Sequence, residues 1–273
     1  MQLKELTLKE CQVGELGLLK KLDEICSNLR INYFIMYGSL IGTVRHHGFI
    51  PWDDDIDIAL KRQDYNKLID YLIKNDKSLR PFSVNTFNVT NNYPYYVARF
   101  CDERFLLKFY NLKYQSGLFI DLYPFDGMGN EDDKEYWRRQ FPQIQNYRRK
   151  MIYSVSSGIS YGSNFAHKIY NFPNVFSSKI NGNIKYGTYL DAIASKYTWN
   201  NSTFVGNALW ADKLVFFEKD LFDKSIKLKF EDFEVNVPAN YDKILKMIYG
   251  DYMEFPPVEE RVPHHEYKAY KFV

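Results

Sequence analysis

The chain has 273 residues, of which 45% are hydrophobic, so it is long and apolar enough to bury a core. Its 36 Lys and Arg nearly balance its 34 Asp and Glu, and so weak a positive charge argues against a protein that mainly holds nucleic acid. Cys11, Cys26 and Cys101 form neither a disulfide framework nor a zinc spacing. The start is charged and no run approaches ~18 apolar residues. We therefore expect a cytosolic protein that touches at most the inner face of a membrane.

The first quarter of the chain alternates helices and strands. Helical spacing of Leu18, Leu22, Ile25 and Leu29 predicts a helix over residues 3–30. The next predicted elements are a strand over 33–37, a short helix over 40–46, a strand over 56–59 and a helix over 64–74.

The remaining elements divide into strands, then helices, then strands again. Strands are predicted at 82–87, 95–101, 104–110 and 118–123, and Pro124 is expected to end the last of them. Residues 131–198 are predicted to be mostly helical, and strands return at 214–222 and 226–237 before a final helix over 241–249. This order predicts an α+β fold with a mixed sheet flanked by helices.

An acidic cluster opens the second predicted strand. Residues i and i+2 of a strand point the same way, so Asp55 and Asp57 project from one face and Ile56 and Ile58 from the other. Two adjacent carboxylates repel each other unless a cation lies between them, and a site of oxygen ligands suits Mg²⁺ or Mn²⁺. A solvated acidic loop is the alternative, but the flanking residues 49–52 and 56–60 are mostly apolar. We therefore expect a metal site here.

A further carboxylate lies in a similar setting. Asp121 is surrounded by the apolar residues of the strand 118–123. It is either paired with a buried arginine or a third catalytic carboxylate, and we favour the second interpretation.

The turn before the acidic strand offers groups that bind anions. A strand that ends at Gly38 and Ser39 and opens a helix presents backbone N–H groups and a hydroxyl to a phosphate. Arg45 could reach phosphate oxygens from that helix, or pair with Asp53 or Asp54.

Together these residues resemble a known family. The segment GSLIGTVRHHGFIPWDDDIDI (38–58) is similar to the LicD family, which includes phosphocholine transferases and fukutin-related proteins with a nucleotidyltransferase fold. The segments GLFIDLYPFD (117–126) and VPANYDKILKMIYGDYM (237–253) agree with later motifs of that family, as do Arg261, His264 and His265.

The resemblance implies a metal-dependent transferase. The donor would be CDP-choline, or CDP-ribitol or CDP-glycerol in some branches, and the acceptor a sugar hydroxyl of a teichoic acid, lipopolysaccharide or capsule, free or lipid-linked. The chain would divide into a nucleotidyltransferase-like catalytic core (1–129), a mostly helical acceptor-side region (130–213) and C-terminal strands and helix that complete the site (214–273).

The resemblance also assigns roles to residues. Asp55, Asp57 and Asp121 would be catalytic and hold the metal, with Asp121 as base or as ligand of a second metal. Six residues would bind the donor: Gly38, Ser39, Arg45, Arg99, His264 and His265. Arg99 could instead pair with an acidic residue, and the two histidines could simply be exposed.

Three questions stay open at this point. A true nucleotidyltransferase acting on an NTP would use the same acidic residues, and an inactive glycan-binding relative is a rival that is not an enzyme. A quaternary ammonium group needs an aromatic cage, but the abundance of Tyr and Trp alone does not show one. The basic run 134–150 is either a solvated helix face or a patch for an anionic acceptor or membrane.

Overall fold

A computed structural model describes residues 2–158, 165–263, 265 and 267–273. Nine strands form one mixed sheet, whose main path runs β1-β11-β5-β6-β3-β2. These six strands are β1 (Leu3–Glu5), β2 (Phe34–Ile35), β3 (Asp57–Lys61), β5 (Ala98–Phe109), β6 (Gln115–Gly129) and β11 (Tyr267–Phe272). Strand β4 (Phe82–Asn85) pairs with β5, while β7 (Phe204–Gly206) joins β6 to β8 (Phe217–Glu218). A separate hairpin contains β9 (Ser225–Phe230) and β10 (Phe233–Pro238).

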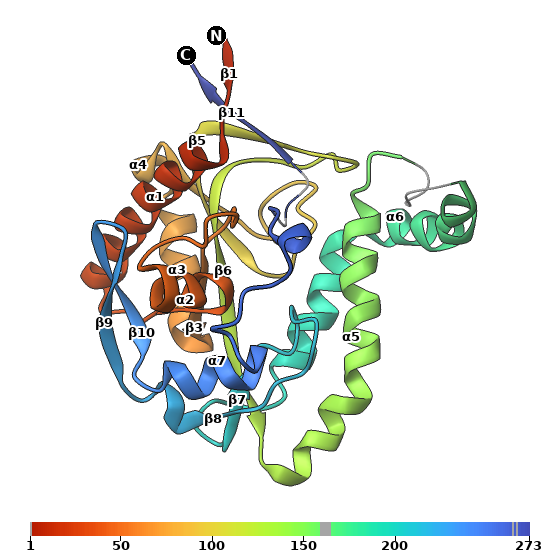
Figure 1. The fold of residues 1–273 in the computed structure, drawn as a ribbon. Coiled ribbons are helices and arrows are strands. Elements are labelled where there is room, and N and C mark those ends of the chain that lie inside the picture. Colours follow the sequence, from red (N-terminus) through yellow and green to blue (C-terminus); the bar gives the residue numbers. More distant parts are fainter. Residues whose placement is uncertain (1, 159–164, 264, 266) are drawn as a thin grey trace.

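Helices from the first part of the chain pack on the sheet, whereas two helices from the middle of the chain pack mainly on each other. Helix α1 (Leu8–Leu29) contacts β5 and β6, and α3 (Arg62–Lys74) contacts β3, β4 and β6. Helices α5 (Lys134–Ser154) and α6 (Phe165–Ala194) pack on each other. Figure 1 shows this pair beside the sheet and the two chain ends together, where β1 pairs with β11.

Short helices complete the fold. Helix α2 (Tyr37–Ile41) continues directly into a π-helical turn (Gly42–His46), α4 (Asp76–Leu79) follows α3, and α7 (Tyr241–Tyr249) contacts α2. Three 3₁₀ turns lie at Glu131–Asp133, Lys219–Phe222 and Val258–Glu260. None of the helices in the described ranges is long and apolar enough to cross a membrane. The predicted α+β class with a large mixed sheet is confirmed, whereas the division at 129 and 213 stays a prediction.

Several predicted element boundaries are wrong. Residues 3–5 form a strand rather than helix, because they pair with β11 and α1 begins only after the cap at Thr7. The strands expected at 95–101 and 104–110 are one strand, β5, whose pairing with β6 is irregular between Asp102 and Leu107.

Pro124 does not end its strand. Pairing of β6 with β5 stops at Leu122 and pairing with β7 starts at Asp126, so Pro124 lies where β6 has a neighbour, β3, on one side alone. A missing N–H donor is tolerated at such a position. Strands β7 and β11 were not predicted at all.

Candidate active site

Three carboxylates converge at the start of strand β3. Asp57 lies directly beside Asp121 in the parallel register of β3 and β6, and Asp55 precedes Asp57 by two residues. One oxygen from each of these three groups lies within 4.8 Å of the others. The three carboxylates that the resemblance assigns to the metal therefore converge in the structure, while their catalytic roles stay a prediction.

Backbone contacts fix the positions of these carboxylates. The backbone N–H of Asp57 donates to the hydroxyl of Ser39 at 2.9 Å, and that of Asp121 donates to the carbonyl of Ile56 at 2.9 Å. Ser39 is buried, so its contact with the acidic strand is structural. A Cβ atom at Gly38 would lie 3.0 Å from the Oδ2 atom of Asp53, which leaves little room for a larger residue. A phosphate contact at Gly38 and Ser39 stays a prediction.

The electrostatics of the cluster are unfavourable without a counter-charge. Burial, followed by repulsion from neighbouring carboxylates, raises the pKa of Asp53 to about 6 and that of Asp55 to about 7. The same two causes raise the pKa of Asp57 well above its usual range. The Oδ1 atom of Asp57 is buried and accepts no hydrogen bond from the residues that the structure describes. These oxygen donors fit a hard divalent cation, which would satisfy that atom and offset the repulsion.

Arg99 forms an ion pair with Asp121, one carboxylate of the cluster. Its Nε atom donates to the Oδ1 atom of Asp121 at 2.7 Å, and its guanidinium lies 3.6 Å from the ring centroid of Phe119 and 4.2 Å from that of Tyr95. The side chain is only 2% exposed. The pair with an acidic residue, which the sequence left open, is therefore present, and Arg99 orients Asp121 and offsets its charge. A phosphate contact by Arg99 stays a prediction.

Arg45 links the π-helical turn to the C-terminal segment. Its Nη1 atom donates to the carbonyls of Tyr252 at 2.8 Å and Glu254 at 3.1 Å, and its guanidinium stacks 4.4 Å from the ring centroid of Phe255. These contacts hold the segment after α7 against the helix that precedes the acidic loop. Its predicted role in phosphate binding is not tested by them.

The C-terminal strand brings a histidine to the carboxylates. The Nδ1 atom of His265 lies 3.1 Å from the Oδ1 atom of Asp54, and its Nε2 atom lies 4.0 Å from the Oδ2 atom of Asp55. The hydroxyl of Tyr267 also donates to the carbonyl of Asp54 at 3.0 Å. The predicted site residue His265 is thus at the cluster, whereas His264 lies outside the described residues.

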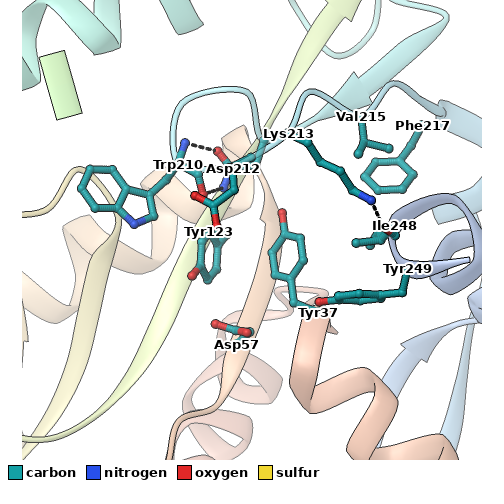
Figure 2. A pocket seen from close by; sticks show the side chains of 12 residues that line it. Tyr37, Asp57, Tyr123, Trp210, Asp212, Lys213, Val215, Phe217, Ile248 and Tyr249 are labelled. Carbon is teal, nitrogen blue, oxygen red and sulfur yellow. Dashed lines mark hydrogen bonds between the residues drawn. The ribbon is translucent and has the colours of Figure 1, made fainter. Parts of the chain in front are cut away.

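A cavity of about 380 Å³ opens from Asp57. Figure 2 shows Asp57 at one end and aromatic side chains from separate parts of the chain around the space. The aromatic residues that line it are Tyr37, Tyr123, Trp210, Phe217 and Tyr249. Figure 2 also shows Lys213, whose ammonium donates to the carbonyl of Ile248 and so joins the loop after β7 to α7. We refer to this cavity as the aromatic pocket.

Arg148 supports the wall of the aromatic pocket from behind. Its guanidinium lies 4.5 Å from the ring centroid of Trp210 and also contacts the carbonyl of Ala211. The sequence did not predict this pocket, because its residues come from α2, β3, β6, the loop after β7, β8 and α7. Only their arrangement in space distinguishes them from the many other aromatic residues of the chain.

Glu15 is a second feature that the sequence analysis missed. It is completely buried in α1, and its carboxylate oxygens have no hydrogen-bond partner among the described residues. Burial, followed by the charge of Asp55, raises its pKa well above the usual range. A signal was available in the sequence, since Glu15 falls on the same helical face as Cys11, Leu18 and Leu22.

Comparison with known proteins agrees with this site. Residues 30–158, which include all three clustered carboxylates, match the family model described as LicD/FKTN/FKRP, nucleotidyltransferase domain. This part of the chain thus resembles a domain of the nucleotidyltransferase class. It is 27% identical, over 98% of its length and 99% of the relative, to the lipopolysaccharide cholinephosphotransferase LicD of Haemophilus influenzae. Residues 30–158 therefore match the LicD family, and the similarity to the Haemophilus influenzae relative extends over nearly the whole chain.

A second relative is less complete. The chain is 30% identical to an uncharacterised protein of Rickettsia typhi over 161 residues, which cover 51% of this chain and 48% of the relative.

Proposed function

We propose that the chain transfers phosphocholine from CDP-choline to a sugar hydroxyl of a cell-surface glycan. The observation that carries this proposal is the opening of the aromatic pocket directly from Asp57. In phosphocholine, two carbons separate the phosphate from the quaternary ammonium group. A phosphate held beside the carboxylate cluster would therefore place that ammonium group among the rings, whose faces attract cations. The name of the Haemophilus influenzae relative supports the same group and a lipopolysaccharide acceptor.

We assign the roles as follows. Asp55 and Asp57 would hold Mg²⁺ or Mn²⁺, which neutralises phosphate charge when bound. Asp121, oriented by Arg99, would accept the proton of the attacking hydroxyl or act as a further ligand. His265, fixed by Asp54, faces the cluster and would contact the donor. In this proposal residues 30–158 have the nucleotidyltransferase fold that the family description implies, and the protein works in the cytoplasm with a nucleotide-linked donor.

The test is product analysis with a panel of donors. The protein is incubated with CDP-choline, CDP-ribitol, CDP-glycerol or CTP, with Mg²⁺ or Mn²⁺ or with EDTA, and with lipopolysaccharide or teichoic acid. We expect CMP release from CDP-choline that depends on glycan and stops in EDTA. Preferential use of CDP-ribitol or CDP-glycerol would reassign the donor, pyrophosphate release from CTP would indicate a true nucleotidyltransferase, and full turnover in EDTA would contradict metal dependence.

A further inference from the structure

Helix α6 is broken into two helical segments. Gly182 has a φ of 76° and a ψ of 160°, which no α-helix contains, and it separates residues 165–181 from residues 183–194. Figure 1 shows the second segment running along α5 and the first segment projecting sideways from the body of the molecule. The first segment is therefore presented to the surroundings.

An apolar stripe follows the outer face of this first segment. Ile169, Phe172, Phe176 and Ile180 are spaced by three, four and four residues, which places them on one side of a helix. Their exposed fractions are 60%, 44%, 58% and 72%, respectively. Ser178, on the other side of the same helix, is completely buried. The helix is thus amphipathic, but with an apolar face turned outward, which indicates that something covers it.

The charged residues in the sequence around this stripe are all Lys or Arg. Between residues 136 and 190 the sequence has no Asp or Glu, although the whole chain has 34. The same stretch contains Arg138, Arg139, Arg148, Arg149, Lys150, Lys168, Lys179 and Lys185.

Some of these cations already have partners, so the surface charge is smaller than the sequence suggests. Arg138 and Arg139 both pair with Glu135, and Arg148 pairs with Asp212. Arg149 and Lys185, in contrast, are exposed on the two packed helices. The predicted basic run is therefore partly a paired helix face, and the charge that remains lies close to α6.

We propose that the apolar stripe docks on the surface of an anionic lipid bilayer. An amphipathic helix with apolar residues on one face and nearby Lys and Arg binds in the interface of such a bilayer, where the rings of Phe and Tyr are well accommodated. A second copy of the chain is a poorer occupant, because a symmetric contact would bring two surfaces of the same positive charge together. This inference does not depend on the proposed reaction.

Vesicle flotation tests the proposal on the full chain. We expect it to float with vesicles of phosphatidylcholine mixed with phosphatidylglycerol, and less with phosphatidylcholine alone. Replacing both Phe176→Ser and Ile180→Ser should weaken vesicle binding by at least about tenfold, since each change removes a large apolar side chain from the interface. Val89→Ser is the matched control, because Val89 is 56% exposed in a turn outside α6. Arg149→Gln with Lys185→Gln should reduce the preference for the anionic vesicles.

Three results would overturn the proposal. The unaltered chain could fail to float with either vesicle, or Val89→Ser could weaken binding as much as the α6 double variant. Sedimentation velocity could also show a dimer that the double variant converts to a monomer, in which case the stripe is a contact between copies of this chain. Circular dichroism checks that the variants, whose changes are all at exposed positions, keep the helix content of the unaltered chain.

Discussion

At the scale of single residues, the three carboxylates differ in their surroundings. Asp57 lines the aromatic pocket and has a buried oxygen without a hydrogen-bond partner in the described chain, whereas Asp121 is held by Arg99. The first arrangement suits a metal ligand and the second suits a group whose orientation matters. A single shared role for these carboxylates therefore fits the geometry less well than a division of labour.

Conservative substitutions should separate the two roles. Asp57→Asn removes one charge from the proposed metal shell, so we expect weaker binding of both Mn²⁺ and CDP-choline by calorimetry. Asp121→Asn should leave both affinities nearly unchanged while transfer falls by ~10²–10⁴-fold, the usual contribution of a general base. Asp70→Asn, at an exposed position of α3, controls for the loss of a negative charge. If Asp121→Asn abolishes metal binding as Asp57→Asn does, Asp121 is a ligand first and the base lies elsewhere.

At the scale of elements, the aromatic pocket depends on loops and helix ends from distant parts of the chain. Trp210 comes from the loop after β7, Tyr249 from the last residue of α7 and Tyr37 from the first residue of α2. Tyr37 has a φ of 52°, a left-handed conformation unusual for a residue with a side chain. The pocket is thus a property of how these elements meet.

Head-group binding should respond to loss of one pocket wall. We expect Trp210→Leu to raise the Kd for phosphocholine by roughly 2- to 30-fold, which corresponds to a cation–π contribution of about 0.5–2 kcal/mol. The Kd for glycerol phosphate, which has no ammonium group, should change little. Trp199→Leu is the control, since Trp199 is also half-buried but lines a different cavity. Equal weakening for both ligands in Trp210→Leu would mean that the ring shapes the pocket without recognising the cation.

The same elements show what the sequence could and could not predict. Local signals sufficed for α7, whose predicted range agrees with the structure, and for the strands that carry Asp57 and Asp121, since apolar residues flank the acids. They did not suffice for β11, because its partners β1 and β5 are distant in sequence and it is short and half-exposed. The family resemblance indicates His265 as a site residue, but its contact with Asp54 is visible only in the structure, because it depends on where β11 lies.

At the scale of the whole molecule, the buried acidic cluster connects metal binding with stability. Asp53 and Asp55 have pKa values raised to about 6 and about 7, and burial and neighbouring carboxylates also raise the pKa of Asp57. In the unfolded chain these groups would titrate near 3.8. Between about pH 4 and about pH 7 the folded protein therefore retains protons that the unfolded chain has released. Because the folded state binds more protons, the free energy of unfolding falls as pH rises across this range.

His265 adds to the same trend. Burial lowers its pKa, but the bond to Asp54 and the charge of Asp55 outweigh burial and leave the pKa raised. A histidine with a raised pKa stabilises the fold when it is protonated, and that contribution is lost as pH rises through its folded pKa. The raised pKa values of the carboxylates and of His265 therefore both predict that the metal-free protein is less stable at pH 8.0 than at pH 5.5.

A divalent cation should reverse this loss at high pH. It needs ionised carboxylates, so it competes with protons at low pH and binds freely at pH 8.0. At a concentration of 100 times its Kd, a bound ion stabilises the fold by about 2.7 kcal/mol, which for a chain of this size raises the Tm by several degrees, at ~2–4 °C per kcal/mol. We expect scanning calorimetry in EDTA and in Mn²⁺ to show a larger metal-dependent rise in Tm at pH 8.0 than at pH 5.5. Asp57→Asn should lose most of that rise, and Asp70→Asn should keep it. A rise of equal size at both pH values, or one that survives in Asp57→Asn, would place the cation away from this cluster.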